Sequence, residues 1–440
     1  MAKSISSKFH PGKRERTLLN LSLNGFNNED AFMGITLKVY LTLPMILLQK
    51  PSASSKAKDH SQALIRRMEW FKNGDYSRLL SECRNIQRQL RPKKSTANMS
   101  KTFAKLVMQG KINAALRFLS DESYGGVLPL SEEVLQSLRD KHPSQAEMKP
   151  NSLLYGPIAD LRNVPIAIDE QDILATAKIL KGAAGPSGLH ANQYIRMLCS
   201  KQFYREGKDL REQIALFAKK IATESIDPSC LETYVANRLI PLDKSPSVRP
   251  IGIGEILRRL VGKSLAKDFK MDFKETAGPI QVCAGHEAGA EAAIHAMEQI
   301  WDEENTEGIL LIDASNAFNA LNRRVALHNI LILCPRPAMA IINTYRNPSR
   351  LFIVGGGELQ SQEGTTQGDP LAMLFYAISI VVLMSFLNAK LAEVKVWLAD
   401  DSTAAGNVCS LLSFLNMIIS DGEKYGYDVN TGKSWLIIKN

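Results

Sequence analysis

The order of apolar and polar residues predicts many helices and a few short strands. Apolar positions recur at helical spacing through much of 61–142, and from 169 onward helix-like and strand-like runs alternate. Helices are predicted at 170–180, 192–198, 210–223, 254–273, 288–301 and 323–334. Strands are predicted at 236–241, 309–312, 351–354, 394–398 and 435–439. The fold class that follows is α+β, preceded by a mainly helical N-terminal region.

Two longer apolar runs raise the question of a membrane span. The run at 33–48 contains Lys38 and Pro44 and is too short to cross a bilayer comfortably. The run at 371–387 approaches the lower limit for a span, but it directly follows a turn-like sequence that ends at Pro370. We therefore expect the second run to be a buried core helix and the protein to have no membrane partner.

Composition divides the chain into three regions. Residues 1–60 form a basic leader that contains Ser and Asn and ends in a linker rich in Ser and Lys, so they need not be ordered. Residues 61–165 form a basic helical region that becomes loop-rich after 143, where prolines recur. Residues 166–440 carry the α+β pattern. The whole chain has 440 residues, of which 45% are hydrophobic, enough for a large core divided into two or three subdomains.

Positive charge is concentrated in one part of the chain. The formal net charge is +9, and 61–110 holds eleven basic residues against three acidic ones. The basic residues of this segment are Arg66, Arg67, Lys72, Arg78, Arg84, Arg88, Arg91, Lys93, Lys94, Lys101 and Lys105. Such a surface either is simply solvated or binds nucleic acid through its phosphates, and the pattern alone leaves both interpretations open.

Cysteine usage and the N-terminal sequence bear on location. The six cysteines, at 83, 199, 230, 283, 334 and 409, are too widely spaced for a zinc knuckle and suggest no disulfide framework. Residues 1–32 lack the apolar stretch of a secretion signal. We expect an intracellular protein of the nucleus or cytoplasm that is not secreted.

Carboxylates follow two of the predicted strands. Asp313 ends the apolar run 309–312, and Asp400 and Asp401 follow the run 394–399. If the two strands are neighbours, these acids meet where buried strands reach solvent. Clustered carboxylates resist burial unless a cation neutralises them, and oxygen ligands of this kind suit Mg²⁺ or Mn²⁺. The pattern therefore predicts a site for two such ions of the kind used in phosphoryl transfer.

Each of these signals has a simpler interpretation when taken alone. An Asp-Asp pair is usually a solvated turn, Asp313 could cap a helix, and Gly368-Asp369-Pro370 reads as a turn followed by a helix. Their order along the chain makes the chemical interpretation stronger than any one of them.

Several motifs in order resemble those of one known family. From about 181 to 439 the chain resembles the reverse transcriptases of retroelements, and it is more similar to the non-LTR and group II type than to the retroviral type. The matching segments are GAAGPSGL from Gly182, the fingers sequence VRPIG from Val248, Asp313 with Phe318, Gln367-Gly368, Ala399-Asp400-Asp401, and GYDVNTGK from Gly426. The resemblance implies the fingers and palm of a right-hand polymerase, with an antiparallel palm sheet.

The resemblance also implies roles for individual residues. Asp313 and Asp400 would hold the two Mg²⁺ or Mn²⁺ ions, with Asp401 less certain because alternate residues of a strand face opposite ways. Lys244 and Arg249 would bind the triphosphate from a fingers hairpin. Phe318 would exclude the ribose 2′-hydroxyl, and Gln367 and Gly368 would lie close to the new base pair. Lys433 would protonate the pyrophosphate that leaves.

The same resemblance implies the partners and the reaction. The expected partners are an RNA template, a DNA primer and dNTP, whereas the sequence does not predict an oligomeric state. The expected reaction is RNA-directed DNA synthesis, and Phe318 disfavours the alternative of RNA-directed RNA synthesis. The first alternative to DNA synthesis is an inactive, truncated relic that only binds nucleic acid.

The chain departs from the family at three points. Leu398 stands where an aromatic residue usually precedes Ala-Asp-Asp, and Ser187 stands where the family has Asp. The chain also ends a few residues after Lys433, which leaves no length for a thumb, RNase H or endonuclease domain. We therefore expect a truncated polymerase whose activity the sequence alone does not guarantee.

Overall fold

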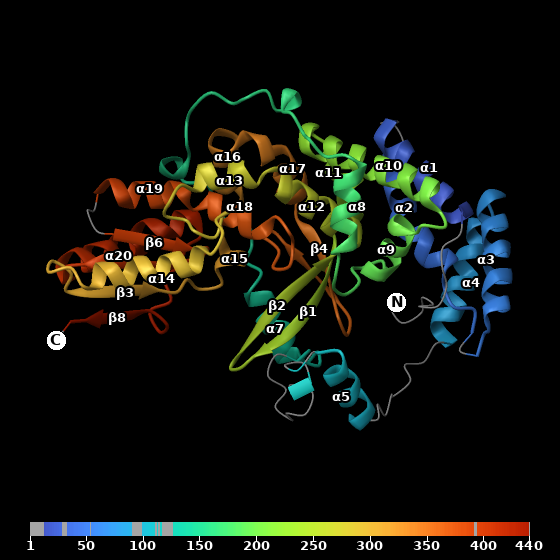
Figure 1. The fold of residues 1–440 in the computed structure, drawn as a ribbon, viewed down its shortest axis with the longest axis horizontal. Coiled ribbons are helices and arrows are strands. Elements are labelled where there is room, and N and C mark those ends of the chain that lie inside the picture. Colours follow the sequence, from blue (N-terminus) through green and yellow to red (C-terminus); the bar gives the residue numbers. More distant parts are fainter. Residues whose placement is uncertain are drawn as a thin grey trace.

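The chain folds as a mixture of helices and small sheets (Figure 1). The computed structural model describes residues 13–28, 33–52, 54–89, 99–110, 112, 115–116, 126–390 and 394–439. Within these residues there are two four-stranded sheets, with strand orders β2-β1-β4-β5 and β6-β7-β3-β8. The predicted α+β class is therefore confirmed at this level.

The first sheet is built around a long hairpin. Its strands are β1 (Asn237–Lys244), β2 (Ser247–Gly254), β4 (Ser349–Ile353) and β5 (Glu358–Ser361). β1 pairs with β2 antiparallel along its whole length and with β4 in parallel. The hairpin extends away from the helices that surround its base (Figure 1). It therefore carries the residues near its tip out from the helical body.

The second sheet is entirely antiparallel. Its strands are β6 (Val394–Leu398), β7 (Asp401–Gly406), β3 (Gly308–Ile312) and β8 (Trp435–Ile438). Helix α20 (Val408–Gly422) packs on β3 and β7, and α14 (Gly289–Trp301) contacts β6 and β7. This sheet lies at one end of the molecule, and the N-terminal helices lie at the other (Figure 1).

Most predicted helices are present with small changes at their ends. The helices between 126 and 345, besides α14, are α7 (Glu132–Asp140), α8 (Glu170–Lys178), α9 (Ala191–Cys199), α10 (Tyr204–Thr223), α11 (Pro228–Val235), α12 (Ile256–Asp268), α13 (Lys270–Ala277), α15 (Ala317–Ala320), α16 (Arg323–Leu333) and α17 (Pro335–Tyr345). The predicted helix 254–273 is two helices, because the chain leaves helical geometry at the buried Phe269.

The apolar run after Pro370 forms helices α18 (Ala372–Ser379) and α19 (Val381–Lys390). Among the described residues, Ala372–Ala389 alone has the length and hydropathy of a membrane span, and 56% of that stretch is buried inside the protein. Phe375, Ile378 and Leu383 are fully buried in the main core. The run thus packs as a core helix, as its position after a turn predicts.

Residues 1–60, which composition describes as a leader that need not be ordered, contain two of the described helices. Helices α1 (Lys13–Asn28) and α2 (Met33–Leu47) pack on one another, α1 also packs on α10, and α2 packs on α11. Phe26 and Leu37 are fully buried, and the Phe26 ring lies 4.8 Å from that of Phe217. The partners of these helices lie far along the chain, so local composition could not reveal the packing.

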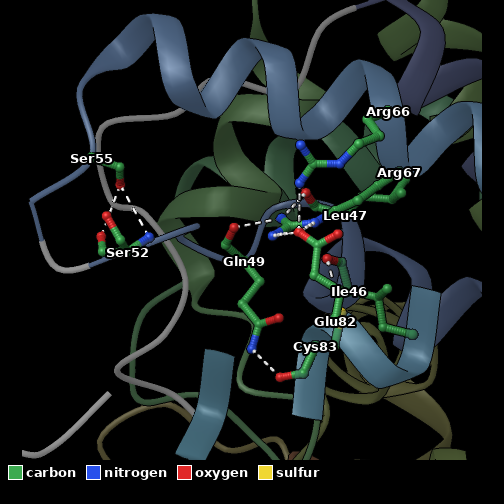
Figure 2. Close-up of polar contacts among 9 residues, drawn as sticks. All are labelled: Ile46, Leu47, Gln49, Ser52, Ser55, Arg66, Arg67, Glu82 and Cys83. Atoms are coloured by element: carbon green, nitrogen blue, oxygen red, sulfur yellow. Dashed lines mark hydrogen bonds and ion pairs between the residues drawn. The ribbon is translucent and has the colours of Figure 1, made fainter. Parts of the chain in front are cut away.

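The basic region folds as helices α3 (Ala57–Lys72), α4 (Tyr76–Gln89) and α5 (Met99–Met108). Arg67 is not part of a binding surface. It is buried, donates to the carbonyls of Leu47 and Gln49 at 3.1 and 2.6 Å, and pairs with Glu82 at 3.1 Å (Figure 2). This arginine joins the end of α2 to α4 because it satisfies carbonyls that α2 leaves open.

The remaining basic side chains of α3 and α4 are largely exposed. Arg66 and Arg78 lie over the Trp70 ring, with guanidinium carbons 5.2 and 4.6 Å from its centroid. The other exposed ones are Lys58, Lys72, Arg84 and Arg88. Arg91, Lys93 and Lys94 lie outside the described residues. The cysteines, all six of which are described, are free, as expected.

Candidate functional site

Strand pairing brings the predicted carboxylates to one edge of the second sheet. β3 and β7 are antiparallel neighbours, with Ile312 opposite Ser402. Asp313 directly follows β3, and Asp401 begins β7, so the register sets these two acids at adjoining ends of paired strands. Asp400 occupies the turn between β6 and β7. The predicted apolar strands therefore do place their terminal acids together.

The turn that carries Asp400 is strained and is held by a buried glutamine. Leu398 pairs with Asp401, and Ala399 in the loop between them adopts a left-handed φ of 58°. The side chain of Gln281, fully buried, accepts from the Ala399 amide at 2.9 Å and donates to its carbonyl at 3.1 Å. This double contact fixes the backbone immediately before Asp400.

Asp313 is fixed by a turn near the end of the chain. The Asn430 side chain donates to Asp313 Oδ2 at 3.0 Å, and the Asn430 amide donates to the Asp313 carbonyl at 2.8 Å. The Asp313 amide donates to Ser434 Oγ at 3.2 Å. Lys433 belongs to this turn, since its amide donates to the Asn430 carbonyl at 3.0 Å. The motif that contains Lys433 is therefore bound directly to the first carboxylate.

Burial and repulsion between acids raise the pKa of Asp400 and of Asp401. The pKa of Asp400 is raised to about 6, chiefly by burial and further by the charges of Asp401 and Asp313. Burial and Asp313 also raise the pKa of Asp401. Lys244 acts in the opposite direction on both groups. A cation brought here would relieve this repulsion.

The β1–β2 hairpin faces the carboxylates with basic residues. Lys244 ends β1, and Arg249 on β2 is opposite Leu242, so the two exposed basic side chains share one face of the hairpin. The charge of Lys244 lowers the pKa of Asp400 and Asp401, so the tip of the hairpin lies near these acids. The hairpin thus joins two sheets into one site.

The Gln367-Gly368 segment attaches the hairpin base to the site. The Gly252 amide on β2 donates to the Gln367 carbonyl at 3.0 Å. Gly368 has a φ of +108°, and a Cβ there would lie 2.6 Å from the Gly252 carbonyl oxygen. Only glycine fits this close approach of two backbones. The close contact with β2 therefore explains why position 368 requires glycine. A contact with a base pair would be a second reason.

Phe318 lies on the short helix α15, and its ring is partly buried. The ring stacks on Tyr376 with centroids 4.7 Å apart and planes at 25°. Tyr376 is fully buried, and burial raises the pKa of its hydroxyl well above the ordinary value, with a further contribution from Asp400. Phe318 is thus packed on a buried tyrosine on which Asp400 acts, and the residue itself is partly exposed.

Two residues that hold the turn of Asp400 were not found from the sequence. They are Gln281 and Tyr427. The Tyr427 hydroxyl donates to the Asp400 carbonyl at 2.7 Å, so a tyrosine reaches this turn even though position 398 is leucine. Its place beside Gly426 in a noted motif was a usable signal. Gln281 lies outside every motif, and only tertiary structure reveals it.

Ser187 takes part in a buried contact rather than in the carboxylate site. Its amide and hydroxyl donate to the Glu255 carboxylate at 2.6 and 2.7 Å. Burial raises the pKa of Glu255, and these two hydrogen bonds oppose that shift. An Asp at position 187 would set a second carboxylate against a buried one, which is a physical reason for serine here.

The carboxylates of this site could supply some of the ligands of a Mg²⁺-type ion, but not all of them. Among the described residues, no group of three or more His, Cys, Asp or Glu side chains is arranged so that it could hold a metal ion. Mg²⁺ commonly takes one or two carboxylates and completes its shell with water and substrate phosphates. The oxygen donors of Asp313, Asp400 and Asp401 suit that mode. No protein-family model matches this chain.

Proposed function

We propose that this chain contains the fingers and palm of an RNA-directed DNA polymerase of the retroelement type. One observation carries the proposal. Asp313 and Asp401 stand at adjoining ends of paired antiparallel strands, Asp400 lies in the turn beside them, and Lys244 on a separate hairpin acts on that acid pair. Nucleotidyl transfer requires carboxylates that hold metal ions and cationic side chains that face them.

The proposed reaction joins a nucleotide to a primer. The primer 3′-oxygen bonds to the α-phosphorus of a dNTP, the bond from that phosphorus to the bridging oxygen breaks, pyrophosphate leaves, and the hydroxyl proton passes to solvent. Two Mg²⁺ or Mn²⁺ ions, held by Asp313, Asp400 and Asp401, would supply charge neutralisation to the attacking and leaving oxygens. The side chains contribute position and charge.

The other site residues then have distinct tasks. Lys244 and Arg249 bind the triphosphate oxygens as donors on a shared hairpin face. Lys433, held in the turn that is bound to Asp313, is the candidate proton donor to pyrophosphate. Gln367 and Gly368 hold the hairpin base in register with the carboxylates and line the position of the incoming base pair.

Phe318 supports DNA synthesis over RNA synthesis. Its ring is stacked on Tyr376, partly exposed and unable to retreat without losing that contact. A rigid ring at this position excludes a ribose 2′-hydroxyl by volume. RNA-directed RNA synthesis would require a smaller residue there.

Nucleic-acid binding without catalysis is the second candidate function. It is favoured by the exposed arginines of α3 and α4. These could bind nucleic acid whether or not the carboxylate site is catalytic. Arg66 and Arg78 flank the partly exposed Trp70, a combination of charge and aromatic surface suited to phosphates and bases.

Primer extension on an RNA template tests the proposal. The chain should extend a DNA primer with dNTP far better than with rNTP, and should need Mg²⁺ or Mn²⁺. Phe318→Ala should raise rNTP incorporation relative to dNTP, because the volume of the ring is removed. Binding of the primer-template without any extension, under either metal, would leave only the second function.

A further inference from the structure

Arg258 is a buried arginine that links the Gln367-Gly368 turn to the base of the β1–β2 hairpin. It lies on α12, and its Nε is 2.6 Å from Oδ2 of Asp369, the residue that follows the turn glycine. Both side chains are only 3% exposed. The Nη1 of Arg258 donates to the Val235 carbonyl at 2.8 Å, at the end of α11 and just before β1. One side chain therefore contacts both segments.

Asp369 in turn fixes the residues on either side of it. Its Oδ1 accepts from the Leu371 amide at 2.9 Å, and its own amide donates to the Thr366 carbonyl at 3.0 Å. Helix α12 also packs closely on the next residue, because a Cβ at Gly262 would lie 3.3 Å from Cβ and Cγ of Pro370. The conformation of the turn therefore depends on its contacts with α12.

Arg258 also reaches the first residue of the hairpin. Asn237, which begins β1, accepts from Nη1 of Arg258 at 3.4 Å, and the Asn237 side chain donates to the Val235 carbonyl at 2.8 Å. On the other strand of the hairpin base, the Gly252 amide donates to the Gln367 carbonyl at 3.0 Å. The turn and the hairpin base are thus joined twice, once directly through the backbone and once through Arg258.

A buried ion pair of this kind adds little stability by itself. Taking two charges out of water costs about as much as their attraction returns, so apolar side chains of similar volume often serve the fold equally well. Apolar side chains do not supply direction, however. Arg258 contacts Asp369 and the Val235 carbonyl through separate nitrogens that are fixed in one plane. The pair therefore fits a role in positioning better than a role in stability.

We propose that Arg258, acting through Asp369, is a positioning residue that sets the Gln367-Gly368 turn in a fixed place against the β1–β2 hairpin. This placement determines how the incoming nucleotide is held, because the turn lines the position of its base and the hairpin carries Lys244 and Arg249 for its triphosphate. The part that concerns the nucleotide rests on the proposed polymerase function. Arg258 itself is buried and does not touch the substrate.

The test removes both charges of the pair and compares the result with a matched pair elsewhere. Arg258→Met/Asp369→Asn leaves no buried charge without a partner, and Asn keeps an oxygen that can accept at the start of α18. The control is Arg211→Met/Glu170→Gln, on α10 and α8. Arg211 is also buried, lies 2.8 Å from the Glu170 carboxylate and donates to the Leu198 carbonyl. Each of the two guanidinium groups lies over a tyrosine ring, at 5.7 and 5.6 Å.

In primer extension, Arg258→Met/Asp369→Asn should lower kcat/KM for dNTP by roughly tenfold to a hundredfold, the loss that a misplacement of about 1 Å causes. The loss should fall on the apparent KM for dNTP, because the residues that hold the nucleotide shift while the carboxylates do not. The primer-template Kd should stay within about twofold of that of the wild type, and the control variant should match the wild type in both constants.

Thermal unfolding of each variant checks that the fold is intact. If Arg258→Met/Asp369→Asn does not fold, Arg258→Lys takes its place, because it keeps the charge but replaces two separate nitrogens by one. The same rise in the apparent KM for dNTP is then expected.

The outcomes separate this inference from the polymerase proposal. An unchanged KM for dNTP in the Arg258 variant, with an active wild type, overturns the inference and leaves the polymerase proposal intact. Equal losses in the Arg258 and Arg211 variants, or a loss in the primer-template Kd alone, also overturn it. If the wild type does not extend primers, the polymerase proposal fails and hydrogen exchange at the Gly252 amide decides. Faster exchange in the Arg258 variant than in the control supports the positioning role, and equal exchange contradicts it.

Discussion

At the scale of single residues, Asp400 combines three unfavourable features in one position. Its carboxyl is largely buried, it lies beside two other acids, and the residue before it has left-handed backbone geometry. Proteins retain such strain where function requires it. The sequence predicted the acids from their place after apolar strands, but it gave no sign of Gln281, whose contact with Ala399 joins segments far apart in the chain.

The raised pKa of Asp400 predicts a measurable effect on stability. Because its folded pKa of about 6 exceeds the unfolded value of 3.8, the folded state keeps the proton longer, and the free energy of unfolding falls as pH rises between these values. Asp400→Asn, measured by urea unfolding in EDTA, should stabilise the protein at pH 7.5 by on the order of 2 to 3 kcal/mol. The gain should vanish near pH 4. A gain that is equal at both pH values would contradict the assigned shift.

Gln281 predicts a second effect. Gln281→Leu keeps the volume but leaves the Ala399 amide and carbonyl without their partner, so it should lower the free energy of unfolding by about 1 to 3 kcal/mol. The control is Gln360→Leu on the exposed part of β5, which should change stability by less than about 0.5 kcal/mol. Equal effects in the two variants would show that Gln281 does not hold the turn.

At the scale of elements, the pattern predicted those strands whose apolar residues are contiguous. β7 was missed because it reads DSTAAG, small and polar residues that become buried only through pairing with β3 and β6 on either side. β5 is short and lies at a sheet edge, where local pattern is weak. The basic helices were predicted, but Arg67 could be separated from its exposed neighbours only by its contacts with α2 and Glu82.

The exposed face of α4 predicts salt-dependent binding. Replacing Arg78, Arg84 and Arg88 together with Gln should weaken binding to a primer-template and reduce the slope of log K against log salt by up to about 3, since each lost phosphate contact removes one released counterion. A matched variant would remove three surface charges that already have acidic partners, at Lys208, Lys267 and Arg350. If both triple variants bind alike at every salt concentration, the α4 face is only solvated.

At the scale of the whole molecule, the N-terminal helices belong to the same core as the later elements. Leu23, Phe26 and Leu37 share one hydrophobic cluster with residues of α10, α12 and α18. Sequence composition could not predict this, because α1 and α2 are buried by helices that lie far along the chain, α10 and α11. Helices α3 and α4 lie at one end of the molecule, and the second sheet, which carries the carboxylates, lies at the other (Figure 1). Long nucleic acid, rather than a small ligand, could contact both.

A matched pair on α2 tests whether this helix is part of the fold. Leu37 is fully buried, whereas Ile35 is 63% exposed. Leu37→Ala should lower the free energy of unfolding by about 2 to 5 kcal/mol, because it opens a cavity in the main core. Ile35→Ala should cost less than about 1 kcal/mol. Similar small effects of both substitutions would mean that α2 is detached in solution.

The most direct test of the polymerase proposal is extension of a DNA primer on an RNA template by Asp400→Asn and wild type, measured alongside primer-template binding. Asn keeps the shape of Asp but removes the charge that would hold the metal, so the loss should fall on transition-state stabilisation. We predict that Asp400→Asn abolishes extension while the Kd for primer-template stays within about twofold of that of the wild type. The control is Asp209→Asn, which replaces a partly buried acid on α10 and should leave extension normal. Full extension by Asp400→Asn would contradict the proposed site.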